Sequence, residues 1–97
     1  MSLLDHVIEA VTAELGVSRA QLLSPTRSSQ RVATARQVAM CVAYRADKSS
    51  NYSSVGRLFD RDRTTVRHAV HKCDDMNDEM RSRINELVNH VRTTAVI

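Results

Sequence analysis

The chain has 97 residues, of which 42% are hydrophobic and 26% are charged, with two Gly, one Pro, one Phe, two Tyr and no Trp. This length predicts one small domain over residues 1–97, with an aliphatic core and without a separate cofactor-binding domain. The scarcity of Gly and Pro argues against a turn-rich β protein and the composition favours helices, so we expect an all-α fold.

The positive charges are concentrated in the middle of the chain. The formal net charge is +3 and the sequence pI is about 9.3. Eleven of the 14 Lys and Arg residues fall between positions 19 and 72, where the acids are Asp47, Asp60 and Asp62. A basic middle between near-neutral ends indicates one basic face, which is typical of a protein that binds nucleic acid.

Cysteines and hydropathy indicate the cellular setting. Cys41 and Cys73 lie in apolar helical patterns and are expected to be buried thiols. No paired spacing indicates a disulfide framework, no apolar run reaches transmembrane length, and the first residues do not resemble a signal peptide. We therefore expect a cytoplasmic protein without membrane contact, and a nucleic-acid partner would make it nucleoid-associated.

The first third of the chain predicts two helices and a loop. Leu3–Leu15 is amphipathic, and Gly16 is placed to end it. Ser18 and Gln21 form a capping-box pattern that opens a second, short helix. Residues 24–30 form a polar loop that holds a lone arginine, Arg27.

The middle of the chain predicts a long helix and a short one. The apolar stripe of the long helix runs from Arg31 to about Arg45, and Arg36 and Gln37 lie in its middle, either solvated or directed at a ligand. Asn51 is placed to cap a helix over Tyr52–Leu58. Gly56 within it indicates close packing at that point.

The next stretch predicts a helix with a polar, basic start. Phe59–Asp60 forms a tight turn, and Asp62 is a good N-cap for the helix that follows. Arg61, Arg63, Thr64 and Thr65 gather around its first turn, while Val66, Ala69, Val70 and Cys73 mark its buried side. Two helices joined so tightly have the layout of a helix-turn-helix, in which the second helix enters the major groove. An ordinary capped surface helix also fits this stretch.

A last helix is expected from Asp78, which we interpret as its cap, to about Val91. Its apolar stripe from Met80 to Val91 either folds back over the core or pairs with another chain. The acidic residues 74–79 would then meet a basic partner.

Several of these segments, taken in order, resemble the C-terminal DNA-binding domain of the bacterial replication initiator DnaA. They are Arg36-Gln37-Val38-Ala39-Met40, then Val55-Gly56 and Phe59, then Arg61-Asp62-Arg63-Thr64-Thr65-Val66-Arg67-His68-Ala69. Leu22-Leu23-Ser24 with Arg27 also fits, so the resemblance covers residues 5–92. It implies a Trp-repressor-like helical domain that binds duplex DNA.

The resemblance also implies roles for individual residues. Carried over by position, Asp62, Arg63 and Thr64 would face bases, and Thr65 would lie at or near the backbone. Arg27 matches an arginine that reaches into the minor groove. Phosphate or backbone contacts are implied for Arg36, Gln37, Tyr52 and Ser53. For Arg61, Arg67 and Lys72, general attraction to phosphates is sufficient.

The chain departs from the family pattern at the recognition turn. Arg63 replaces the usual His, and Arg prefers the O6 and N7 acceptors of guanine, so we expect an altered base preference. The usual glycine pair before the motif is reduced to Asp60. No ATPase domain and no G-x-x-x-x-G-K-[ST] motif is present, so we expect no ATP hydrolysis and no origin melting by this chain alone.

Other chemistry finds little support in the sequence. His68, His71 and Cys73 lie close together on one helix without a second cluster, whereas zinc sites usually need four ligands. No catalytic set is recognisable, so we expect no enzyme, no metal and no cofactor.

Two functions remain open from the sequence. The first is a stand-alone, sequence-specific binder of duplex DNA that regulates transcription or occupies replication-origin sites. The second is a helical module that keeps the fold but binds a protein through its C-terminal helix. We expect a monomer or a weak dimer.

Overall fold

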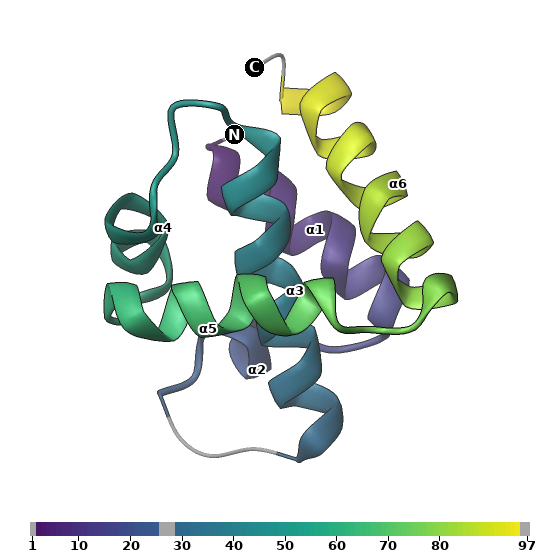
Figure 1. Cartoon of the computed structure of the whole chain (residues 1–97), viewed down its shortest axis with the longest axis horizontal. Coiled ribbons are helices and arrows are strands. Elements are labelled where there is room, and N and C mark those ends of the chain that lie inside the picture. Colours follow the sequence, from purple (N-terminus) through teal and green to yellow (C-terminus); the bar gives the residue numbers. More distant parts are fainter. Residues whose placement is uncertain (1, 26–28, 96–97) are drawn as a thin grey trace.

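The computed structural model describes residues 2–25 and 29–95, and within them the chain forms six helices and no strand (Figure 1). The all-α fold is therefore confirmed. In chain order, the helices are α1 (Leu3–Leu15), α2 (Arg19–Leu23), α3 (Gln30–Ala46), α4 (Tyr52–Phe59), α5 (Arg63–Asp74) and α6 (Asp78–Ala95).

Helix α3 is the centre of the fold, and it packs against each of the other five helices. Its buried positions include the small residues Ala35, Ala39 and Ala43 at a spacing of four, which lets neighbouring helices approach closely. The buried hydrophobic residues of all six helices join into one core cluster. Among the residues that the structure describes, Phe59 is the one aromatic residue buried in it, so the core is mainly aliphatic as predicted. Cys41 and Cys73 are both buried and free.

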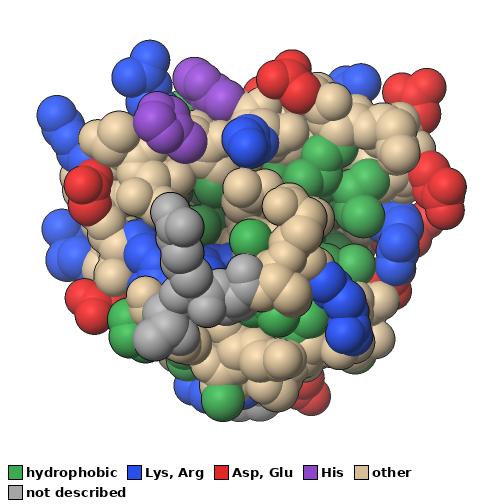
Figure 2. All heavy atoms as spheres, turned by 90° about the horizontal axis from the view of Figure 1, so that it is seen from below, with side chains coloured by type: hydrophobic (Ala, Val, Ile, Leu, Met, Phe, Trp, Pro, Cys, Tyr) green, Lys and Arg blue, Asp and Glu red, His purple; other side chains and the backbone are tan. Residues whose placement is uncertain are grey.

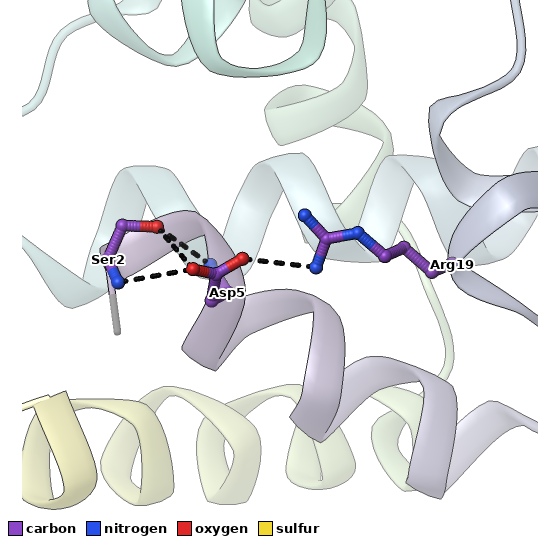
Figure 3. A network of polar contacts seen from close by, with 3 residues as sticks. All are labelled: Ser2, Asp5 and Arg19. Carbon is purple, nitrogen blue, oxygen red and sulfur yellow. Dashed lines mark hydrogen bonds and ion pairs between the residues drawn. The ribbon is translucent and has the colours of Figure 1, made fainter.

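The start of α1 is fixed by a polar network that also holds α2 (Figure 3). The Asp5 backbone N–H donates to the Ser2 hydroxyl, and the Ser2 backbone N–H donates to the Asp5 carboxylate, which forms a capping box. Arg19, at the start of α2, donates to the same carboxylate at 3.0 Å. These hydrogen bonds, that of Arg19 first, hold the pKa of Asp5 below its ordinary value.

Most predicted helix ends are confirmed. Gly16 ends α1 in the left-handed conformation, with φ at 68°. Ser18 and Gln21 form the predicted capping box at α2, and Asn51 caps α4. The predicted cap of the last helix is wrong by one residue, because Asn77, not Asp78, accepts from the Met80 backbone N–H at 2.9 Å.

The apolar stripe of α6 faces the core. Ile84, Leu87, Val88 and Val91 are buried, and α6 packs against α1 and α3. The interpretation of this stripe as an open surface for a partner chain is therefore wrong for these residues. They contribute instead to the stability of the fold, since each buried aliphatic side chain is worth about 1.5–3 kcal/mol.

Candidate nucleic-acid interface

The turn between α4 and α5 is tight and closely packed. Asp60 ends α4 in the left-handed conformation, with φ at 54°, and the Arg61 backbone N–H donates to the Gly56 carbonyl oxygen at 2.8 Å. A Cβ on Gly56 would lie 2.5 Å from the Arg61 carbonyl oxygen. The predicted close approach at Gly56 is thus confirmed, and the neighbour is the backbone of the turn.

Helix α5 begins on the far side of this turn with its polar end outward. The carboxylate of Asp62 accepts from the Thr64 backbone N–H at 2.7 Å, so the predicted N-cap is confirmed. Val66, Ala69, Val70 and Cys73 are buried against α3 and α4. The opposite face is exposed, and it carries Arg63, Thr64, Thr65, Arg67, His68, His71 and Lys72.

The start of α4 and the start of α5 share one open hollow. Its lining residues come from both helices: Asn51, Tyr52, Ser53, Arg57, Arg63, Thr64 and Arg67. The hollow thus brings together five residues that the sequence singled out, from two separate segments. It adds Arg57 and the helix cap Asn51, neither of which the sequence analysis placed in the candidate site. The signal for Arg57 was available, because Ser53 and Arg57 are four residues apart and therefore share one helical face.

Three arginines of this hollow are unengaged. Within residues 2–25 and 29–95, Arg57, Arg63 and Arg67 make no hydrogen bond and no ion pair. Figure 2, seen from below, shows several Lys and Arg side chains, with some acidic ones among them and histidines nearby, on the side where α4 and the start of α5 lie in Figure 1. Other Lys and Arg side chains lie on the opposite side. More of the acidic side chains lie at the opposite upper edge. The free guanidinium groups are thus available to an external anion.

Arg36 and Arg61, unlike these three arginines, donate hydrogen bonds within the protein. Arg36 donates from Nε to the Leu22 carbonyl oxygen at 3.0 Å and from a terminal nitrogen to that of Gln21 at 2.7 Å. Arg61 donates to the Ser24 carbonyl oxygen at 2.6 Å. Partial burial and the charge of Arg61 lower the pKa of Arg36. Phosphate contacts by Arg36 and Arg61 stay predictions, and both side chains already have partners within the protein.

Other predicted site residues have contacts outside this hollow. Tyr52 stacks on Tyr44, with ring centroids 5.0 Å apart and planes inclined by 18°. Gln37 and Lys72 line a second hollow near the end of α5, together with Met76. Arg27 lies outside the described residues.

The sequence cluster His68, His71 and Cys73 does not come together in space as a ligand set. Both histidines are exposed, whereas Cys73 is 3% exposed and faces the core. Among the described residues, no three His, Cys, Asp or Glu side chains are placed to hold a metal ion. None of the described helices combines the length and the apolar character needed to cross a bilayer.

Two comparisons with known proteins agree with each other on the family that this chain resembles. The sequence model of the family described as bacterial dnaA protein helix-turn-helix matches residues 4–73. The chain is also 38% identical over 84 residues to the chromosomal replication initiator protein DnaA of Xanthobacter autotrophicus (strain ATCC BAA-1158 / Py2). The match covers 86% of this chain and 16% of that relative, so the chain spans a small part of the relative's length.

Proposed function

We propose that this chain, which belongs to the bacterial DnaA helix-turn-helix family, binds duplex DNA with the start of α5 in the major groove. The observation that carries this proposal is the hollow shared by α4 and α5. It gathers Arg57, Arg63 and Arg67, none of which has a partner among the described residues. Arginines on one exposed face can neutralise the phosphates of a duplex.

The arrangement of the two helices suggests which groups read bases. In a helix-turn-helix, the first turn of the second helix contacts base edges, and the first helix lies across the backbone. Arg63 and Thr64 occupy that first turn, and both are exposed. We assign Arg63 to a guanine, through its O6 and N7 acceptors. Asp62 caps α5 with Oδ1, which leaves Oδ2 to accept from a cytosine amino group.

The backbone contacts would come from residues around this reading turn. We assign Tyr52, Ser53, Arg57, Thr65 and Arg67 to phosphates beside the major groove. Gln37 and Lys72 would extend these contacts toward the end of α5, and Arg27 would reach the minor groove. These contacts fix the register of α5 on the duplex without reading the sequence.

In the cell, such a domain would act as a transcription regulator or as an occupant of replication-origin sites, without ATPase activity. A helical module that binds a protein is the alternative, and the buried stripe of α6 removes the surface on which that alternative first rested. We propose a cytoplasmic monomer or weak dimer.

Selection of bound sequences from a random duplex pool tests this proposal. We expect one enriched motif, with Kd values that rise steeply between low and moderate salt because bound Lys and Arg displace counterions. A protein-binding module would enrich no motif. Binding without a salt slope would also contradict the proposal.

A further inference from the structure

Two arginines join the ends of two helices through backbone carbonyl oxygens. Arg36 donates to the carbonyl oxygens of Gln21 and Leu22, near the end of α2. Arg61 donates to the Ser24 oxygen and to those of Phe59 and Asp60, at the end of α4. We call Arg36, Arg61 and these five carbonyl groups the arginine clasp.

The physical reason for the clasp lies in the helix ends. The last carbonyl groups of a helix have no partner within the helix and carry its partial negative charge. Guanidinium groups satisfy several such oxygens at once, because their donors point outward in one plane. In this way one Arg61 side chain connects the end of α2 with the end of α4, although Ser24 and Arg61 are 37 residues apart.

The clasp also ties the α4–α5 turn to the centre of the fold. Arg36 belongs to α3, and α3 packs against every other helix. The chain of contacts runs from α3 through Arg36 to the end of α2, and from Ser24 through Arg61 to Phe59 and Asp60. Phe59 and Asp60, followed by Arg61 itself, lead directly into the Asp62 cap of α5.

We infer that Arg36 and Arg61 are positioning residues for base recognition, because they hold the turn before α5 against the end of α2. This inference rests on the proposed function. If it is correct, the clasp sets the angle at which α5 presents Arg63 and Thr64 to a base pair. A phosphate contact alone would need the positive charge of these side chains but not their planar shape.

Replacement by lysine separates the two roles, since Lys keeps the charge and loses the planar set of donors. The experiment compares wild type with Arg36→Lys and Arg61→Lys, and it uses Arg92→Lys as the control, because Arg92 is exposed on α6. Kd is measured for the selected duplex and for a random duplex at several salt concentrations. Circular dichroism at the binding temperature shows whether each variant is folded.

The informative quantity is the specificity ratio, the Kd for random DNA divided by the Kd for the selected duplex. We expect each clasp variant to lower this ratio about tenfold, with little change in random-DNA affinity or in the salt slope. Arg92→Lys should leave the ratio unchanged. A purely structural effect would reduce the folded fraction and weaken both affinities equally, so it would not change the ratio.

Other results would contradict the inference. If both Lys variants keep the wild-type ratio, or if both affinities fall together, the positioning role is wrong and the proposed function stands. If wild type itself prefers no sequence, the proposed function fails and this inference fails with it. If one variant does not fold, the other still decides, since each removes one arm of the clasp.

Discussion

The two groups of arginines around the α4–α5 turn differ in what they contact. Arg57, Arg63 and Arg67 line an open hollow and have no partner among the described residues. Arg36 and Arg61 are partly buried and donate to backbone carbonyl oxygens. The same residue type therefore serves two purposes within one basic segment. A count of positive charges overestimates the number of side chains that are free to meet a phosphate.

The largest expected effect comes from a change that disturbs both groups at once. Gly56→Ala places a methyl group 2.5 Å from the Arg61 carbonyl oxygen, and a backbone atom cannot move away cheaply. We expect the free energy of unfolding to fall by about 3 kcal/mol, measured by urea denaturation. Gly16→Ala is the comparison, because it adds left-handed strain of about 1–2 kcal/mol at φ 68° and its Cβ meets only the end of the Arg31 side chain, at 3.0 Å, without touching the turn. If the free energy of unfolding falls by the same amount in both variants, close packing of Gly56 against the turn is not the cause of the loss.

The next largest effect tests the open group alone. Arg63→Ala removes the expected contact to guanine, and we expect a loss of about 1–3 kcal/mol in discrimination at one or two base pairs. The stability of the protein should not change, because the Arg63 side chain is exposed. Binding selections with Arg63→His should move the preference toward the pattern of the initiator's own sites. An unchanged motif in both variants would remove Arg63 from the base-reading residues.

A smaller and more uniform effect is expected at Arg67, one helical turn further along α5. Arg67→Ala should weaken binding to all duplexes alike and reduce the slope of log K against log salt by about 0.9. Titrations of the selected and random duplexes at several salt concentrations measure this slope. A change confined to the selected duplex would instead assign Arg67 to base reading.

The helices were predictable from the sequence because their signals are local. Apolar spacing and the caps at Ser18, Asn51 and Asp62 lie within a few residues of the helix ends that they define. Where two adjacent residues can both cap, local signals are ambiguous: the sequence favours Asp78, whereas Asn77 is the residue that accepts from the Met80 backbone N–H. Similarly, an apolar stripe such as that of α6 does not reveal whether the core or another chain covers it.

The open part of the candidate site was also predictable, whereas the clasp was not. Exposure of Arg63 and Thr64 follows from the cap and the periodicity of α5. The partners of Arg61 depend on Ser24, 37 residues earlier, and on the path of the chain between them. No spacing rule connects those positions. Asp60 shows a similar limit of prediction from the sequence. It adopts a left-handed φ of 54°, a conformation in which glycine is the usual residue.

The smallest expected effect compares the two ends of α2, which arginines hold in different ways. At its start, Arg19 donates to the Asp5 carboxylate, whereas near its end Arg36 donates to carbonyl oxygens, which do not titrate. The pKa of Asp5 in the folded protein lies below the ordinary 3.8, mainly because of Arg19. Its stabilising contribution is therefore present above the unfolded-state pKa and is lost as the pH falls through the folded-state value.

Unfolding measured from about pH 7 down to about pH 2 should thus show a gap between wild type and Asp5→Asn that closes in acid. The gap should be small, since both side chains of the Arg19–Asp5 pair are partly exposed to solvent. Arg36→Lys, by contrast, should differ from wild type by the same amount at every pH, because the carbonyl acceptors keep their charge distribution. A gap that stays constant for Asp5→Asn would mean that the carboxylate stabilises α1 and α2 by its shape and not by its charge.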